Sequence, residues 1–251
     1  MKQSFTLLFF LLLFSITSFS QLTHSFTDRE KTFKEVSELF KNQQFAVAFP
    51  LLQELKSQYS QNPSDYPGYW VDDLDFFYII AGLKLGLTSA EDQSIQYLNW
   101  ISNSPRKEQM YYHLGQYYFI KNDFRKSLEN YKSVGLDNLN NEQIANAKFE
   151  MAYCYFNLKM LKEAKPLFNE IQQLNESKYY LSANYYYGFI SYYDHLYDQA
   201  LKSFKIVEKA EEYKNIVPYY IAEIYYFQQK KDASLRYSES IINKNELYYA
   251  N

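Results

Sequence analysis

Residues 111–134 read YYHLGQYYFIKNDFRKSLENYKSV, and this stretch decides the fold. Counted from Gly115, an aromatic residue stands at +3, a small residue at +12, another aromatic residue at +16 and an aliphatic residue at +19. The same order of small and large positions returns along most of the chain. The anchors, one for each copy of the pattern, are Val36, Gly82, Gly115, Ala152, Gly188 and Ala222.

The spacing of the anchors predicts a series of helix–turn–helix units. Successive anchors are 46, 33, 37, 36 and 34 residues apart, so the last five recur with a nearly constant period. A glycine inside a helix is about 1 kcal/mol less favourable than alanine, so the glycines at anchors need a packing reason. We expect the anchor and the +12 residue to mark the crossing of two helices. The large residues at +3 and +16 are expected to fill the space between neighbouring units.

This pattern resembles the tetratricopeptide repeat over about residues 28–243. The resemblance implies an all-α fold, a right-handed α-solenoid of about six helix–turn–helix repeats. The chain departs from the family pattern in lacking the consensus Trp and in placing Ser191 and Ser238 at aromatic positions. In the first unit, Glu35 stands where Leu is usual. The stretch 217–226, VPYYIAEIYY, also resembles the N-terminal part of long exported repeat proteins of Bacteroidota-type bacteria.

The first 20 residues have the composition of a signal peptide. Lys2 precedes the apolar run 7–14, and Ser18 and Ser20 form a small-x-small site, so we expect cleavage before Gln21. A short membrane anchor is the alternative, although the run is shorter than the ~20 residues that span a bilayer. We therefore predict export to the periplasm or cell envelope of a Gram-negative bacterium. After signal cleavage the chain is not expected to be an integral membrane protein.

The chain divides into five predicted segments. They are a signal peptide (1–20), a degenerate N-terminal repeat (21–62), a second repeat with its preceding loop (63–107), four tetratricopeptide-like repeats (108–243) and the start of a further helix (244–251). The loop NPSDYPG at 62–68 is the expected hinge or insertion. Thr27 and Thr88, each followed three residues later by Glu, are expected to form capping boxes at helix starts.

Composition and charge exclude several classes of protein. The 251 residues include 28 Tyr and 20 Phe but only 6 Gly and 6 Pro, too few for a turn-rich sandwich, barrel or nucleotide-binding α/β fold. The 26 Lys and Arg are balanced by 29 Asp and Glu, and this net charge of −3 gives no positive excess to attract nucleic acid. Cys154 is the single cysteine, so the chain has no internal disulfide. Its place beside an aromatic run indicates a small core residue.

The sequence offers little for catalysis or for a cofactor. It has no Gly-rich phosphate loop, no His-Glu-x-x-His motif and no pair of cysteines. His24, His113 and His195 share no metal-ligand spacing. The acidic stretch 72–75, DDLD, could hold a metal, but acids placed at a helix N-terminus are the simpler interpretation. We predict a protein that is not an enzyme and that has no cofactor or metal.

Aromatic residues also recur at offsets −3, +1 and +4, which form one stripe of the first helix in each unit. The family resemblance implies that this stripe lines the concave surface of the solenoid. Ten of the twelve positions in the last four units are aromatic, against 20% of the whole chain. The predicted partner-binding residues are Tyr112, Gln116, Phe119, Phe149, Tyr153, Phe156, Tyr185, Phe189, Tyr192, Tyr219, Glu223 and Tyr226.

Core packing or a compositional bias could also account for the rings at these offsets. A residue at −3 can pack partly against the neighbouring unit and belong to the core. A bias toward Tyr would also place rings on every face of a helix. None of the twelve residues is Lys or Arg. That composition disfavours a resemblance to family members that hold the C-terminal carboxylate of a chaperone with basic residues.

The leading functional hypothesis is a non-catalytic exported scaffold. It would bind a protein or peptide, as an extended segment or a helix, in the aromatic-lined concave groove. The alternative is a glycan-binding helical repeat protein of the cell envelope, because aromatic rings stack on sugars. An enzyme and a sensor ectodomain are less favoured. We expect no nucleic-acid partner, and the incomplete helix at 244–251 predicts self-association through the sixth unit.

Overall fold

The structure is a computed structural model that describes residues 28–63, 68–101, 105–135, 139–174 and 176–249, apart from the side chains of residues 68, 69 and 243–249. All regular secondary structure in these residues is helical, which confirms the predicted all-α class. The predicted signal peptide, Thr27, His24 and most of the 62–68 loop lie outside the described residues. Across the described ranges, no helix is both long and apolar enough to cross a lipid bilayer.

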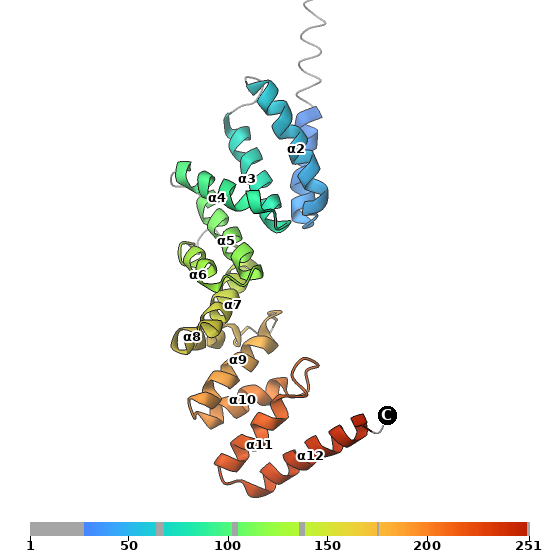
Figure 1. The fold of residues 1–251 in the computed structure, drawn as a ribbon, viewed down its shortest axis with the longest axis vertical. Helices are drawn as coiled ribbons and strands as arrows, with labels where there is room; N and C mark the ends of the chain where they lie inside the picture. The colour runs from blue at the N-terminus through green and yellow to red at the C-terminus, as the bar shows by residue number, and fades with distance from the viewer. Residues whose placement is uncertain (1–27, 64–67, 102–104, 136–138, 175, 250–251) are drawn as a thin grey trace, which may run out of the picture. The chain divides into compact units, whose positions relative to one another are not determined.

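After a helical segment over residues 28–41, the helices follow one another through short connections (Figure 1). Their bounds are α2 (Phe45–Gln61), α3 (Gly68–Lys84), α4 (Thr88–Trp100), α5 (Pro105–Ile120), α6 (Phe124–Lys132), α7 (Asn141–Asn157), α8 (Leu161–Ile171), α9 (Tyr180–Tyr193), α10 (Tyr197–Val207), α11 (Val217–Phe227) and α12 (Lys231–Tyr249). Each helix from α6 to α11 packs against the next helix along the chain, and α3 packs against both α2 and α4. The predicted helical-repeat solenoid is therefore confirmed.

The chain divides into two compact units, one ending at Tyr117 and the other beginning at Tyr118. In the first unit, the core is formed by apolar residues of segment 28–41, α2 and α3. In the second unit, one core cluster joins α6, α7, α8 and α9, and another joins α10 and α11 with rings of α9 packed against it. Each core is thus built by helices that are neighbours in the sequence.

The predicted repeat register agrees with the burial of the side chains. The +12 residues of the first five repeats are all 0% exposed; they are Ala48, Ser94, Ser127, Ala164 and Ala200. A Cβ atom added to Gly188 would lie 3.0 Å from the ring of Phe204 and 3.2 Å from the Cβ of Ser203. The close packing at this anchor therefore leaves little room for a side chain, because the ring of Phe204 would have to shift to admit a Cβ atom. The nearest atoms come from +15 and +16, however, and not from the predicted +12 position.

The turn inside each repeat is a recurrent backbone motif. In five of the six repeats the residue at +7 has a φ between 56° and 64°; these residues are Gln43, Asn122, Lys159, His195 and Gln229. In the fourth repeat the Lys159 amide donates to the carbonyl of Phe156 (3.0 Å), and the Met160 amide donates to that of Tyr155 (2.9 Å). This is a Schellman motif, which closes the first helix by satisfying its last carbonyls. The second repeat turns earlier, at Gly86, with a φ of 74°.

The predicted capping box at Thr88 is wrong. Thr88 is the first residue of α4, and Leu87 before it makes no side-chain hydrogen bond to cap the helix. A capping box lies instead at the start of α7. The Asn140 side chain accepts a hydrogen bond from the Gln143 amide (2.9 Å), and the Gln143 side chain accepts one from the Asn140 amide (3.0 Å). An Asn at the N-cap serves this role as well as Ser or Thr does.

The acidic stretch 72–75 lies in the second turn of α3 and not, as predicted, at its N-terminus. Asp72 accepts hydrogen bonds from the hydroxyl of Tyr97 and the guanidinium of Arg106, each at 2.8 Å. Asp75 pairs with Lys56 of α2. These acids therefore join α3 to its neighbouring helices, since a carboxylate beside a cation is favoured when both are partly buried.

The predicted boundary between residues 243 and 244 is not a helix boundary. A single helix, α12, runs without interruption from Lys231 to Tyr249. The second helix of the sixth repeat is thus longer than α6, α8 and α10, which occupy the same place in the preceding repeats.

Candidate functional site

The two predicted site residues of the first unit are occupied by contacts within that unit. Tyr112 is only 2% exposed, so the predicted exposure of its ring is wrong. The Gln116 side chain donates a hydrogen bond to the Tyr112 hydroxyl (2.9 Å) and accepts one from Lys84. On the same helix, burial lowers the pKa of His113 to about 3, and the nearby charge of Lys84 acts in the same direction. Tyr112 and Gln116 are thus engaged inside this unit, beside a partly buried His113.

In the second unit, rings at −3 are covered by the connection that leads into the next repeat. Phe149 stacks on Tyr179, with ring centroids 4.1 Å apart and 9° between the planes. Tyr185 stacks on Tyr213 in the same way, at 4.5 Å and 14°. Both covering residues stand nine positions before the next anchor. The predicted exposure of Phe149 is therefore wrong, since this stacking leaves it 9% exposed.

Rings at +4 and +1 form a ladder across the repeat boundaries of the second unit. Phe119 at +4 of the third repeat lies 5.5 Å from Tyr153 at +1 of the fourth, measured between ring centroids. Phe156 and Phe189 repeat this contact one repeat later, again at 5.5 Å. All four rings are partly buried. They contribute to the packing between repeats and leave only part of each ring to a partner.

A further aromatic position, −2, was missed by the sequence reasoning. Tyr186 lies 4.9 Å from Phe156 and stacks on Phe168 at 5.1 Å, with 18° between the planes. Tyr220 stacks on Phe204 at 5.3 Å and 13°. The two stacked pairs, Tyr186–Phe168 and Tyr220–Phe204, each join the −2 residue of one repeat to the +16 residue of the repeat before it. The sequence signal that could have revealed this contact is the pairing of rings at those two offsets.

Four exposed rings gather on the fifth and sixth repeats. Tyr226 is 71% exposed, Tyr193 56%, Phe227 50% and Tyr219 46%. Tyr193 and Phe227 stand at +5, an offset that the sequence reasoning also missed. We call these four residues, together with the partly buried Tyr192, the exposed aromatic surface. Of the predicted site residues, it retains Tyr192, Tyr219 and Tyr226, and Glu223 lies beside it.

Glu223 is the acidic member of this group. It stands at +1, where the two preceding repeats carry Tyr153 and Phe189. Its Oε2 accepts a hydrogen bond from the Tyr192 hydroxyl at 2.8 Å. The pKa of Tyr192 is raised to about 12. Burial is the larger cause, and the hydrogen bond to the Glu223 carboxylate is the second. Tyr192 therefore stays protonated at neutral pH and remains a donor to Glu223.

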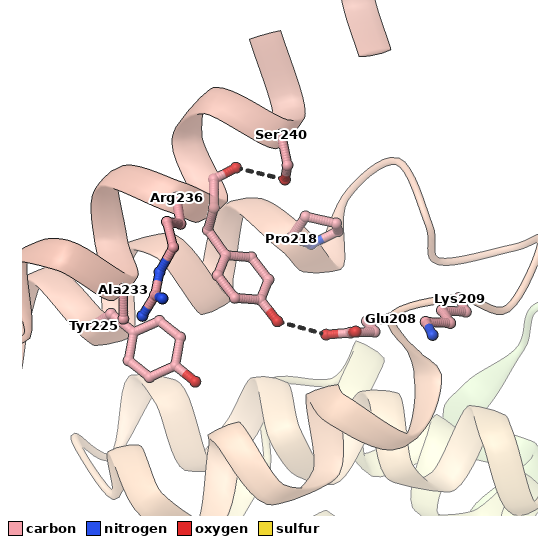
Figure 2. Close-up of a pocket in the computed structure, with 8 residues that line it drawn as sticks. Glu208, Lys209, Pro218, Tyr225, Ala233, Arg236 and Ser240 are labelled. Atoms are coloured by element: carbon pink, nitrogen blue, oxygen red, sulfur yellow. Dashed lines mark hydrogen bonds between the residues drawn. The ribbon is translucent and has the colours of Figure 1, made fainter. Parts of the chain in front are cut away.

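Two cavities flank the last helical pair and differ in their charges. Figure 2 shows the first, about 400 Å³ in volume, in which Lys209 and Arg236 accompany Glu208. The Tyr237 hydroxyl donates a hydrogen bond to Glu208 at 3.0 Å. Lys205 forms an ion pair with the same carboxylate at 3.2 Å. The acid in this cavity already has its counterion.

The second cavity, about 440 Å³ in volume, lies between α11 and α12 and is called the sixth-repeat cavity below. Tyr219, Tyr226 and Phe227 of the exposed aromatic surface line it, and Glu223 is its acid. Neither Lys nor Arg occurs among the described residues that line it.

The other reactive side chains of the described residues do not form a site. Cys154 is fully buried, and burial raises the pKa of its thiol to about 11, as expected for the predicted core residue. His195 lies in the turn before α10, and its Nδ1 is 3.0 Å from the hydroxyl of Tyr197. Within the described ranges, no three His, Cys, Asp or Glu side chains gather in a group that could hold a metal ion.

Comparison with known proteins gives a likeness of fold. No family model matches the chain, and no curated protein sequence does. PilF of Pseudomonas aeruginosa is similar in structure, with a TM-score of 0.57 and 12% identity over 89% of this chain and 93% of that one. YrrB, described as a TPR protein with an unusual peptide-binding site, gives 0.56 and 16% over 75% and 90%. A tetratricopeptide repeat protein of Parabacteroides merdae gives 0.51 and 15% over 86% and 79%.

These similarities, together with the buried helix crossings, define an all-α helical-repeat protein. Its fold is that of the tetratricopeptide-repeat proteins. At such low sequence identity the likeness concerns the fold alone, and the site has to be argued from this chain's own residues.

Proposed function

We propose that this chain is a non-catalytic, exported scaffold that binds a protein segment on the exposed aromatic surface of its fifth and sixth repeats. The observation that carries the proposal is the exposure of Tyr226, Tyr193, Phe227 and Tyr219 on neighbouring repeats. Contiguous exposed rings usually mark a contact site, because burying them against a partner removes a large apolar area from water. Tyr and Phe also lose little conformational entropy when they are fixed.

The proposal narrows the groove expected from the sequence. Tyr112 and Phe149 are core residues, and the rings of the +4/+1 ladder are partly covered by neighbouring repeats. The remaining surface is concentrated on α9 and α11 and is smaller than a trough along four repeats. YrrB, which shares the fold, is described as having a peptide-binding site. That description supports a peptide or protein segment as the class of ligand here.

Export forms part of the proposal and rests on the N-terminal sequence. Lys2, the apolar run 7–14 and the Ser18-x-Ser20 site are the features that support it. A scaffold in the periplasm or cell envelope would meet its partner there. N-terminal sequencing of the mature protein from an envelope fraction tests the cleavage before Gln21, and an intact Met1 would contradict it.

Affinity capture from an envelope extract tests the binding surface. The wild type is compared with a Tyr226→Ser/Phe227→Ser double variant, whose rings are exposed and whose loss should leave the fold intact. Trp100→Ser is the matched control, because Trp100 is 58% exposed on α4 of the first unit. We expect the double variant to lose a partner that the wild type and the control retain. Equal capture by all three proteins would contradict the proposal.

Glycan binding is the competing function, since the same exposed rings could stack on sugars. A glycan array probed with the same three proteins separates the two functions. Sugar binding that depends on Tyr226 and Phe227, without protein capture, would replace the peptide-binding proposal.

A further inference from the structure

The sixth repeat lacks the ring that the two preceding repeats carry at +16. Phe168 and Phe204 fill this position in the fourth and fifth repeats, and both are 0% exposed. Ser238 stands at the equivalent place in the sixth repeat and lines the sixth-repeat cavity. Because a serine is much smaller than a phenylalanine, the space that a ring fills elsewhere stays open here.

The same repeat also exchanges a ring for a charge. Glu223 at +1 is exposed and lines the sixth-repeat cavity. Its carboxylate accepts a hydrogen bond from the Tyr192 hydroxyl at 2.8 Å. Tyr219 and Tyr226 line the cavity with it, and Ile241 contributes an aliphatic wall. The cavity therefore combines one carboxylate, two phenol rings and an apolar surface.

A comparable acid–tyrosine pair joins the C-cap of α10 to α12 and already holds a cation of this chain, three residues before the acid. There the Tyr237 hydroxyl donates to Glu208 at 3.0 Å (Figure 2), as the Tyr192 hydroxyl donates to Glu223. The Lys205 ammonium completes the first arrangement, lying 4.3 Å from the centroid of the Tyr237 ring and 3.2 Å from the Glu208 carboxylate. The sixth-repeat cavity has the acid, which accepts the hydroxyl of Tyr192 from outside the cavity lining, and no described lining residue supplies a cation.

We propose that the sixth-repeat cavity binds a lysine or arginine side chain presented by a segment of a partner protein. The inference rests on the proposed scaffold function and names the chemistry of its ligand. The cationic head would meet Glu223 and the ring faces of Tyr219 and Tyr226, and its aliphatic stem would pack against Ile241. The partner segment is therefore a basic residue flanked by apolar residues.

Charge complementarity excludes the other simple occupants of this cavity. An acidic segment would place a second negative charge beside Glu223, which is unfavourable. An aromatic residue, such as the −2 ring that Tyr220 inserts beside Phe204, would cover Glu223 without supplying a counterion. A basic residue satisfies the carboxylate and the rings together.

An array of random short peptides, probed with the full chain, tests this inference. The proteins compared are the wild type, Glu223→Gln and Glu208→Gln. The last is the matched control, because Glu208 has the same hydrogen bond from a tyrosine but already pairs with Lys205. We expect wild-type binders to be enriched in Lys or Arg next to apolar residues. The best binder should weaken about tenfold in Glu223→Gln, equivalent to about 1.4 kcal/mol, and should be unchanged in Glu208→Gln.

The outcomes separate this inference from the proposed function. Peptides that bind the wild type without enrichment in basic residues, and equally well to Glu223→Gln, would overturn the inference and leave the scaffold function standing. The absence of any binding peptide would overturn both. Dimerisation of the chain in sedimentation, abolished in Glu223→Gln, would assign the cavity to a second copy and overturn the partner proposed here.

Discussion

The Tyr192 hydroxyl donates a hydrogen bond to the Glu223 carboxylate, 2.8 Å away, across the boundary between the fifth and sixth repeats. One repeat earlier the same two offsets bring together two rings, Phe156 and Phe189, with centroids 5.5 Å apart. Two exchanges, Phe to Tyr at +4 and Phe to Glu at +1, thus turn an apolar contact between repeats into a hydrogen bond to a carboxylate. They place the charge beside the exposed aromatic surface.

The raised pKa values of Tyr192 and Tyr185 predict a loss of stability at alkaline pH. Burial is the largest cause for both, and each pKa is about 12 in the folded chain against 10.0 for an ordinary tyrosine. The unfolded state therefore loses protons first, so this stability is complete below pH 10 and disappears as the pH rises toward 12. Urea unfolding across this range should show a falling free energy of unfolding, with a shallower fall in Tyr185→Phe. An identical slope in that variant would contradict the prediction.

The partly buried imidazole of His113, whose Nδ1 is shielded from solvent, predicts a second pH dependence, on the acid side. Its pKa of about 3 lies below the usual 6.5, so the unfolded state takes up a proton first as the pH falls. The associated stability is present above about pH 6.5 and is lost as the pH falls toward 3. Between these limits His113→Gln should lose less stability than the wild type. If the free energy of unfolding, measured by urea unfolding, depended on pH identically in the two proteins, the prediction for His113 would be contradicted.

The close approach at Gly188 predicts that its replacement by a larger residue destabilises the second unit. A Cβ atom there already lies 3.0 Å from Phe204, so Gly188→Leu should lower the free energy of unfolding by ~1–3 kcal/mol. Gly188→Ala should fail to gain the ~1 kcal/mol of helix propensity that alanine usually brings. Lys202→Leu, on the exposed side of α10, controls for added apolar bulk. A wild-type melting temperature for Gly188→Leu would show that the repeat register is misplaced.

The positive φ of Lys159 predicts that glycine stabilises this turn. A non-glycine residue in the left-handed region is strained by ~1–2 kcal/mol, so Lys159→Gly should raise the free energy of unfolding, by less than this because glycine is more flexible in the unfolded chain. Lys159→Val should lower it. The control is Lys202→Gly within α10, where the same replacement should destabilise by ~1 kcal/mol. Urea unfolding measures all three, and a loss of stability in Lys159→Gly would contradict the account of the turn.

The repeat register could be predicted from the sequence because it follows from side-chain size. Small residues such as Ala164 and Ala200 stand at +12, and both are fully buried. The turns could not be predicted in the same way. Lys159 and Gln229 hold the same backbone conformation without sharing any side-chain chemistry. The Schellman hydrogen bonds of the backbone, and not the residue type, impose that conformation.

The site could be predicted only in part because the pattern of one repeat does not show which residues of the following segment cover its rings. The accessibility of Phe149 depends on Tyr179, which belongs to the connection into the next repeat. The openness of the sixth-repeat cavity depends on Ser238, which the sequence showed only as a departure from an aromatic position. Whether a ring on a first helix faces solvent is decided by residues some thirty positions further on.

The most direct test of the central claim, that the exposed aromatic surface is a partner-binding site, is site-specific photo-crosslinking in the native host. A photoreactive phenylalanine analogue replaces Tyr226 in one strain and Trp100, which is also exposed, in another. The account predicts a discrete crosslinked protein adduct from position 226 and none from position 100. Equal adducts at both positions, or an adduct at 100 alone, would contradict it.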